Sequence, residues 1–344
     1  MSATYRFVNW NRHKRVYNAA IAAGALLYVA GFVVISRFAL PAAEGVGDEV
    51  LIMRALGSCA LVLLHVILAI GPLVRLDRRF AALLYNRRHL GVTMFLLALA
   101  HALLALLYYG GFGVQNPIEA IFAAPLGPAG PPFEIFGLAA LAILFLMAAT
   151  SHDFWLATLS PRLWKWLHML VYLAYALLIA HVSFGALHSD RSPLLAAALA
   201  AGVLLLTTLH IAAARRSRPP APSAADQQGW IDLGPPAQIP GSRARLVCLP
   251  QGGSVAVFRD GNTFSAISNV CAHQGGPLAE GKIVSGCVTC PWHGYQYIAA
   301  SGTSPPPYTE KLPTYQLRIS AGRLMLNPRA NPPGTHVTPA EVAP

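Results

Sequence analysis

Two short segments near the C-terminus carry the residues best suited to metal chemistry. Cys271-Ala272-His273 is followed, after a gap of sixteen residues, by Cys290-Pro291-Trp292-His293. Two thiolates and two imidazoles in this order suit a [2Fe-2S] cluster, in which the thiolates bind one iron and the imidazoles bind the other. A one-electron carrier is therefore the first expectation. The alternative is a structural zinc site, although zinc ligands usually group as a cysteine pair followed by a histidine pair.

The residues around these segments predict a small antiparallel β domain. Gly- and Pro-bearing stretches, Gln274–Pro277 and Gly294–Tyr297, follow the two ligand segments and are typical of loops. Alternating apolar and polar residues predict strands at Ser254–Phe258 and Tyr315–Ile319. The sequence therefore predicts a sandwich of short strands with two cluster-binding loops.

Over about residues 229–327 the chain resembles Rieske ferredoxin-type domains. The resemblance implies that Cys271 and Cys290 bind one iron, and that His273 and His293 bind the other. Rieske proteins of the cytochrome bc type add a disulfide pair at positions that are Gly276 and Trp292 here, so this chain is more similar to the ferredoxin or dioxygenase type. Tyr297 lies where bc-type proteins place a tyrosine that bonds a ligand sulfur. An ordinary strand aromatic explains it equally well, and no role is assigned to it.

The rest of the chain has the composition of a membrane protein. Of its 344 residues, 55% are hydrophobic and only 11% are charged. Six apolar runs are long enough to cross a bilayer, so we expect an all-α bundle of six transmembrane helices before the β domain. The runs are Asn18–Phe38, Val50–Leu73, His89–Tyr109, Glu134–Ser151, Leu163–Leu187 and Pro193–Ala213.

These patterns give a five-part domain organisation. Residues 1–17 form an N-terminal segment, residues 18–213 the bundle, residues 214–228 a Pro-rich linker, residues 229–327 the cluster domain, and residues 328–344 a disordered tail. The first run is longer than the apolar part of a cleaved signal peptide, so we expect it to remain as a helix.

The basic residues predict the orientation of the bundle. Lys and Arg are retained on the cytoplasmic side of short loops, and one predicted face collects Arg6, Arg12, Lys14, Arg15, Arg75, Arg78, Arg79, Arg87, Arg88, Arg162, Lys165, Arg215, Arg216 and Arg218. The other face has Arg37 and Arg191. With six spans, both termini and the cluster domain are cytoplasmic. The net charge of +11 arises largely from these loops and does not indicate nucleic-acid binding.

Histidines inside the apolar runs are a second set of candidate ligands. Ionisable side chains are costly in a membrane and tend to mark function, although a single one is often a packing residue. His168 and His181 are thirteen positions apart, which is roughly 20 Å along a helix and suits two haems stacked across a bilayer. On an ideal helix, however, their side chains point about 140° apart. They must therefore meet different neighbouring helices, or the helix must be distorted.

Residues 15–215 resemble the ferric reductase-like transmembrane domain. The resemblance is carried by Arg87–Gly91 leading to His101, by Trp164–Tyr172 leading to His181, and by Arg54 with Gly71-Pro72-Leu73 in the second run. It implies b-type haem, one or two per chain, with His101, His168 and His181 as ligands. Many members have a fourth histidine at the position of Arg87, so His65 and His89 are the candidates for the missing ligand.

Together, the resemblances imply a membrane oxidoreductase that relays single electrons. No Gly-x-Gly-x-x-Gly motif is present for a nicotinamide or flavin, so the expected donor is a separate cytoplasmic reductase or ferredoxin. The acceptor is unknown; a periplasmic redox protein, ferric iron, quinone and dioxygen are the options, and a bacterial inner membrane is the expected location. The alternative is a membrane-tethered carrier or redox sensor that binds the cluster but no haem. A Rieske oxygenase would need a further mononuclear iron site, for which there is no soluble domain.

Overall fold

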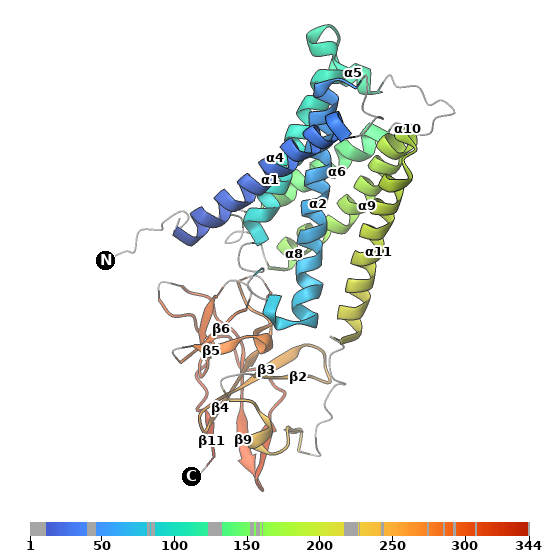
Figure 1. Cartoon of the computed structure of the whole chain (residues 1–344). Helices are drawn as coiled ribbons and strands as arrows, with labels where there is room; N and C mark the ends of the chain where they lie inside the picture. Colours follow the sequence, from blue (N-terminus) through green and yellow to red (C-terminus); the bar gives the residue numbers. More distant parts are fainter. Residues whose placement is uncertain are drawn as a thin grey trace. The chain divides into compact units, whose positions relative to one another are not determined.

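A computed structural model gives the architecture of the chain (Figure 1). It forms a helical unit and a β unit, and each is described by itself. The described residues are 12–39, 46–80, 83, 87–122, 133–151, 155, 159, 161–216, 226, 228–241, 244–273, 275–284, 286–291, 294–306 and 308–342. Most of the predicted linker and the ligand candidate His293 lie outside them.

The helical unit follows the apolar runs of the sequence. Such runs become helices in a bilayer because a helix satisfies its own backbone hydrogen bonds where no water is present. The main helices are α1 (Arg12–Ala39), α2 (Asp48–Leu76), α4 (Arg87–Tyr109), α6 (Phe133–Ala149), α8 (Pro161–Met169), α9 (Val171–Val182) and α11 (Pro193–Arg216). Shorter helical segments are α5 (Pro117–Phe122), α10 (His188–Asp190) and two turns at Arg78–Phe80 and Gly111–Gly113.

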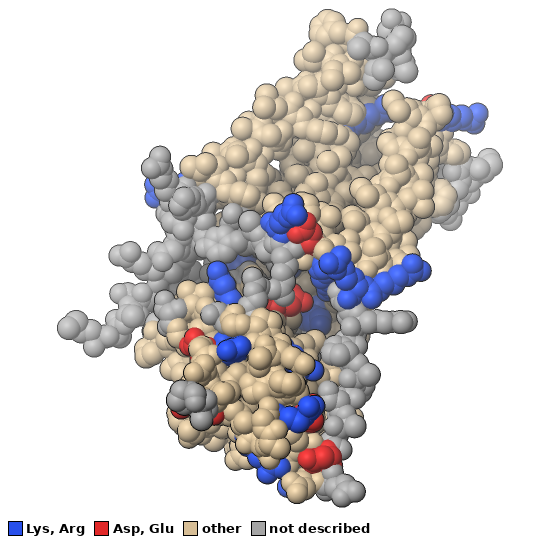
Figure 2. Space-filling model, turned by 60° about the horizontal axis from the view of Figure 1, so that its bottom comes forward, with Lys and Arg blue, Asp and Glu red and all other residues tan. Residues whose placement is uncertain are grey.

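The predicted count of six spanning helices is not confirmed. Within the described residues, five helical stretches are long and apolar enough to cross a membrane: Arg15–Phe38, Asp48–Leu76, Arg87–Tyr109, Leu163–Asp190 and Pro193–Arg216. The remaining predicted run is α6, which is apolar but has only 17 residues. Figure 2 shows a broad surface without Lys, Arg, Asp or Glu over the helices. Large apolar side chains of the helices, such as Leu26, Phe38 and Leu204, are exposed, as lipid-facing residues would be.

The fifth span is distorted between the two histidines that the sequence places on it. Helix α8 ends at Met169 and α9 begins at Val171, with a tighter turn between them in which the Leu170 amide donates to the Leu167 carbonyl (3.2 Å). After His181 the helix widens into a π-helical turn, Ser183–Leu187. Because π turns change the facing of the residues that follow, this span is not the straight helix that a constant rotation per residue assumes.

The core of the helical unit is formed by side chains of α2, α4, α6, α9 and α11. Helix α2 packs against α1, α4 and α11, while α6 packs against α9 and α4. Its buried side chains include Leu64 of α2, Phe95 of α4, Leu144 of α6 and Leu206 of α11. These contacts hold α4 and α9, which carry His101 and His181, in one packed bundle.

The β unit consists of three small sheets in which all paired strands are antiparallel. One sheet has the order β1-β10-β9, the second has β11-β4-β3-β2 with β8 also paired to β4, and the third has β5-β6-β7. The strands are β1 (Ile231–Asp232), β2 (Ala244–Cys248), β3 (Ser254–Asp260), β4 (Thr263–Ser268), β5 (Lys282–Val284), β6 (Cys287–Thr289), β7 (Gln296–Ile298), β8 (Thr314–Tyr315), β9 (Leu317–Ser320), β10 (Arg323–Leu326) and β11 (Ala340–Glu341).

The strand prediction at Ser254–Phe258 is confirmed by β3, but the prediction at Tyr315–Ile319 is partly wrong. That stretch is interrupted at Gln316, so that β8 pairs with β4 and β9 pairs with β10 in another sheet. The alternation of apolar and polar residues does not reveal the break, because it has the same two-residue period in both strands.

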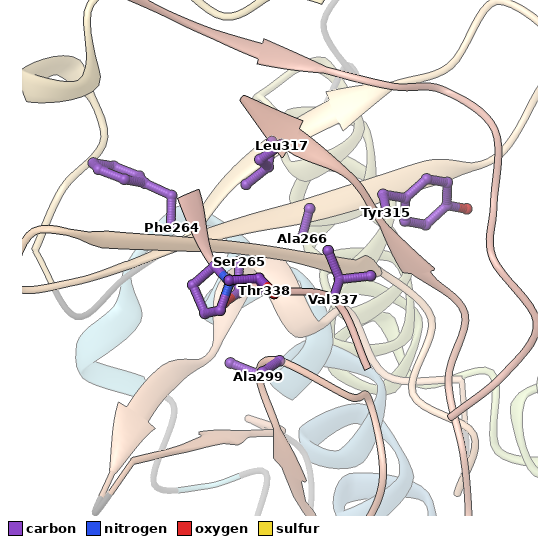
Figure 3. A pocket seen from close by; sticks show the side chains of 10 residues that line it. Phe264, Ser265, Ala266, Ala299, Tyr315, Leu317, Val337 and Thr338 are labelled. Carbon is purple, nitrogen blue, oxygen red and sulfur yellow. The ribbon is translucent and has the colours of Figure 1, made fainter. Parts of the chain in front are cut away.

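The predicted disorder of residues 328–344 is wrong for the part that the structure describes. The tail runs over the sheet with Val337 and Thr338 beside β4 and β8 (Figure 3). Val337 N–H donates to the Ala300 carbonyl (2.8 Å), and Ala340–Glu341 pair with β4. The Pro-rich composition suggested a chain unable to form a core, but its backbone groups pair with strand edges and Ala340 packs against the buried cluster around Phe264.

Candidate metal centres

The two cluster-binding loops have the same backbone hydrogen bonds. In the first, Cys271 N–H donates to Gly276 O (2.9 Å), and Gly275 N–H donates to Cys271 O (2.7 Å). In the second, Cys290 N–H donates to Tyr295 O (2.8 Å), and Gly294 N–H donates to Cys290 O (3.0 Å). Gly275 and Gly294 have φ of 71° and 70°, a conformation that glycine adopts without steric cost. Each cysteine is thus held by an equivalent turn.

Three of the four predicted cluster ligands are in the described residues. Cys271 and Cys290 are both buried and belong to one apolar cluster with Val288 and Tyr297. The Nδ1 atom of His273 is shielded from solvent. No three His, Cys, Asp or Glu side chains of the described ranges surround a single point.

Tyr297, to which the sequence assigns no role, contacts a predicted ligand. Its hydroxyl oxygen accepts a hydrogen bond from Ala272 N–H (3.1 Å) and lies 3.3 Å from Cys271 Sγ, to which the O–H can donate. The side chain is fully buried. Burial, followed by the negative charge of the Cys271 thiolate, raises the pKa of Tyr297. The hydroxyl therefore keeps its proton and remains a donor to the sulfur.

In the helical unit, His101 of α4 and His181 of α9 form a facing pair. Their ring centroids are 6.1 Å apart and the rings are nearly perpendicular, at 84°. Two imidazoles on opposite sides of one metal ion, each with a metal–nitrogen bond of about 2 Å, place their centroids about 6 Å apart. The separation therefore fits one iron with two axial histidines.

Both rings of this pair are oriented by backbone carbonyls. The Nδ1 atom of His101 lies 2.8 Å from Met53 O, and that of His181 lies 2.9 Å from Phe133 O. Within the described part of the chain, neither Nε2 atom has a hydrogen-bond partner. Metal-binding histidines characteristically donate the other ring N–H to a carbonyl or carboxylate, which fixes the tautomer and the ring orientation. This pair has that arrangement.

Helical glycines make room for the two rings. A Cβ atom at Gly57 would lie 2.9 Å from Nδ1 of His101, and one at Gly137 would lie 2.8 Å from Nδ1 of His181. Gly57 is four residues after Met53, and Gly137 is four residues after Phe133. Each histidine thus packs against the same arrangement on the neighbouring helix, which is a backbone carbonyl that bonds Nδ1 and a glycine one turn later. The sequence reading missed these glycines, although an isolated glycine in a helical run is a recognised sign of close packing.

The structure does not bring the other predicted haem ligands into this pair. Both ring nitrogens of His65 have protein partners, because Nδ1 lies 2.9 Å from Leu61 O and Nε2 lies 3.0 Å from the Tyr175 hydroxyl. His168 lies on α8, with Nε2 3.3 Å from Ser151 Oγ. His89 is in the first turn of α4 and twelve residues before His101, which is roughly 18 Å along the helix.

Comparison with known proteins agrees with a two-part chain. Residues 55–179 match the ferric reductase like transmembrane component, and residues 229–316 match the Rieske [2Fe-2S] domain. The protein-methionine-sulfoxide reductase heme-binding subunit MsrQ of Herminiimonas arsenicoxydans is 30% identical over 199 residues, covering 56% of this chain and 87% of that protein. MsrQ of Ralstonia nicotianae is 35% identical over 130 residues, 38% of this chain and 56% of that protein.

The β unit has its own relatives. The anthranilate 1,2-dioxygenase ferredoxin subunit of Burkholderia cepacia is 36% identical over 74 residues, which cover 21% of this chain and 68% of that protein. The fold and the matches define a multi-pass membrane protein with a β-rich iron–sulfur domain. The chain belongs to the ferric reductase-like transmembrane family and carries a C-terminal Rieske [2Fe-2S] domain.

Proposed function

We propose that this protein relays single electrons through a Rieske cluster and haem b, between a donor and an acceptor at or across the membrane. The observation that carries the proposal is the His101–His181 pair, whose separation of 6.1 Å and carbonyl-oriented rings suit an iron with two axial histidines. The match to haem-binding MsrQ subunits and the Rieske domain in the same chain support it.

The residues have separate parts in this proposal. Cys271, Cys290, His273 and His293 hold the [2Fe-2S] cluster, and His101 and His181 hold one haem. Single-electron transfer is the chemistry that these groups supply when bound. The carbonyls of Met53 and Phe133 fix the two imidazole tautomers, and Tyr297 holds a hydrogen bond on a ligand sulfur. The apolar core around α2 keeps water from the histidine pair.

A second haem would use His168 with His89. They precede His181 and His101 by thirteen and twelve residues, respectively, so such a site would lie about one bilayer leaflet away from the first. His65 is a poor candidate for the fourth ligand because both its ring nitrogens are occupied.

We also propose that α6 crosses the membrane as a sixth span. Its 17 residues reach the lower limit for a spanning helix. With six spans, the excess of basic loops places both termini and the Rieske domain in the cytoplasm of a bacterial inner membrane. The domain limits are then residues 18–213 for the bundle and 229–327 for the Rieske domain. A cytoplasmic reductase or ferredoxin would be the donor, and the acceptor would be a periplasmic redox protein, ferric iron, quinone or dioxygen.

The test is the cofactor content and redox behaviour of the purified full-length protein. Haem and iron per chain, the visible spectrum after chemical reduction and the electron paramagnetic resonance (EPR) spectrum of the cluster are measured together. The proposal expects two cluster irons per chain, at least one b-type haem, and reduction of both groups. A cluster without haem would overturn the relay and leave the tethered carrier. Absence of both would overturn the proposal as a whole.

A further inference from the structure

A tyrosine outside the ligand pattern stacks on the ligand His273. The ring centroids of His273 and Tyr295 are 4.8 Å apart and their planes differ by only 9°. Tyr295 follows Cys290 by five positions and belongs to the second ligand loop, whereas His273 belongs to the first. The stack therefore covers one face of the imidazole and joins the two loops through side chains.

Tyr295 is fixed at both of its ends. Its backbone carbonyl accepts the Cys290 N–H at 2.8 Å. Its hydroxyl donates to the carboxylate of Glu310, which also accepts the Thr309 N–H at 3.1 Å. One residue thus contacts a ligand from each loop, with its ring on His273 and its main chain on Cys290.

A closed loop brings Glu310 to this position. The Ser304 N–H donates to the Glu310 carbonyl (2.9 Å), and Tyr308 N–H donates to the Pro305 carbonyl (3.1 Å). The same loop places the Tyr308 ring 4.9 Å from that of Tyr295, at 58°. The side chain of Tyr308 is exposed. It provides a control, since it packs on Tyr295 from the solvent side.

We propose that Tyr295, anchored by Glu310, is a positioning residue that fixes the His273 imidazole and lowers the reduction potential of the cluster. This inference rests on the proposed role of His273 as an iron ligand. It assigns a function to two residues that the ligand spacing does not include. Tyr295 acts through the histidine on which it stacks, whereas Glu310 acts by anchoring Tyr295 and by its negative charge.

The direction of the effect follows from charge. With two thiolates and two neutral imidazoles, the oxidised cluster is neutral and the reduced cluster carries one negative charge. A ring that covers His273 keeps water from the ligand that would otherwise help to solvate this charge. The carboxylate of Glu310 adds a negative charge near it, which also disfavours reduction. Removing either one should therefore raise the potential.

The experiment compares four variants of the full-length protein by iron content, EPR g values and a redox titration of the cluster signal. Tyr295→Leu should raise the reduction potential by about 59 mV, which for one electron corresponds to a tenfold increase in the ratio of reduced to oxidised cluster. Its g values should also differ from those of the wild type. Tyr295→Phe should restore the wild-type g values, because its ring can still stack. Glu310→Gln should raise the potential without changing iron content. Tyr308→Leu should match the wild type.

The outcomes separate this inference from the proposed function. A wild-type protein without cluster iron would overturn both. A Tyr295→Leu protein with full iron, wild-type potential and wild-type g values would overturn the positioning role alone. If Tyr295→Leu fails to fold or loses its iron, the decision passes to Glu310→Gln, and an unchanged potential in that variant overturns the inference.

Discussion

In His101 and His181 the Nδ1 atom is hydrogen-bonded to a backbone carbonyl of a neighbouring helix, so the Nε2 atom of each ring is available to bind a metal. The two residues come from α4 and α9, and their rings are 6.1 Å apart. The carbonyls belong to α2 and α6, so the pair draws on four helices. Its geometry thus depends on helix packing as much as on the histidines.

Replacing either histidine of the pair should remove haem. In His101→Ala or His181→Ala one axial ligand is lost, and the b-type haem content measured by pyridine haemochrome should fall below a tenth of the wild-type value. His65→Gln is the matched control, since His65 bonds to Leu61 and Tyr175, and it should retain haem. Unchanged haem in the His101 and His181 variants would contradict the prediction and show that other residues hold the haem.

Small substitutions at the two glycines should weaken haem binding without removing a ligand. In Gly57→Ala and Gly137→Ala the new Cβ would lie 2.9 Å and 2.8 Å from the Nδ1 atoms, closer than a Cβ contact allows. Disturbing the groups that orient a metal ligand typically costs 10- to 100-fold in affinity, so haem titration should show a loss of roughly that size. Gly24→Ala, with open space around it, should bind haem normally.

Each of the two buried cysteines should be required for the cluster. Cys271→Ser and Cys290→Ser should lose most of the iron and acid-labile sulfide, measured by elemental analysis and a sulfide assay. Cys248→Ser is the control, because Cys248 is in β2 and outside the two loops. One zinc per chain and no sulfide in the wild type would contradict the prediction and support the zinc alternative.

Removing the Tyr297 hydroxyl should lower the potential of the cluster. Tyr297→Phe deletes the contact with Cys271 Sγ (3.3 Å), and a hydrogen bond to a ligand sulfur favours the more negative, reduced state. A hydrogen bond of about 1 kcal/mol corresponds to roughly 40 mV for one electron. Redox titration of the EPR signal checks the shift, and an equal or higher potential would contradict it. Because Tyr295→Leu should shift the potential upward, the two tyrosines should be distinguishable by sign.

The β unit should lose one stabilising interaction in acid. Asp232 accepts a hydrogen bond from Gly234 N–H and pairs with Arg323 at 2.6 Å, and these contacts lower the pKa of its carboxyl group. A lowered folded pKa means that the stabilisation is present above the unfolded pKa of about 3.9 and is lost as the pH falls through the folded value. Asp232→Asn should therefore increase hydrogen exchange in β1 at neutral pH, and the difference should vanish once the pH lies below the folded pKa of Asp232.

The control for this pH effect is Asp260→Asn. Asp260 lies at the exposed end of β3, and its main chain, not its side chain, accepts the hydrogen bond from Thr263. Exchange in β1 should be the same as in the wild type at both pH values. A difference between Asp232→Asn and the wild type that persisted in strong acid would contradict the assignment.

The sequence suggests candidate site residues, but it does not mark the groups that orient them. The spacing of Cys271, His273 and Cys290 indicated the cluster, and the apolar runs indicated the helices. In contrast, the partners of His101 and His181 are the carbonyls of Met53 and Phe133, and every residue has a carbonyl, so no residue type marks them. Tyr295 was read as part of a loop because its stacking on His273 depends on how two loops meet.

Two features of the fold cannot be read from composition. The turn at Leu170 and the π-helical turn at Ser183–Leu187 interrupt a run whose composition is uniformly apolar. An apolar composition indicates that a segment lies in lipid, but it does not indicate where the helix is distorted. In the tail, abundant proline suggested disorder, yet Ala340 and Glu341 pair with β4, and Val337 N–H donates to the Ala300 carbonyl in the turn after β7. A segment that forms its hydrogen bonds with an existing β unit needs little strand propensity of its own.

The tail has one further consequence, for self-association. Strand β4 pairs with β3 along one side, while β11 and β8 together follow its other side from Thr263 to Ile267. An unpaired strand edge is a template onto which another chain can add. Because two short strands from distant parts of the sequence occupy this edge, β4 offers no such template. The tail strand β11, together with β8, thus removes β4 as an edge for association with another chain.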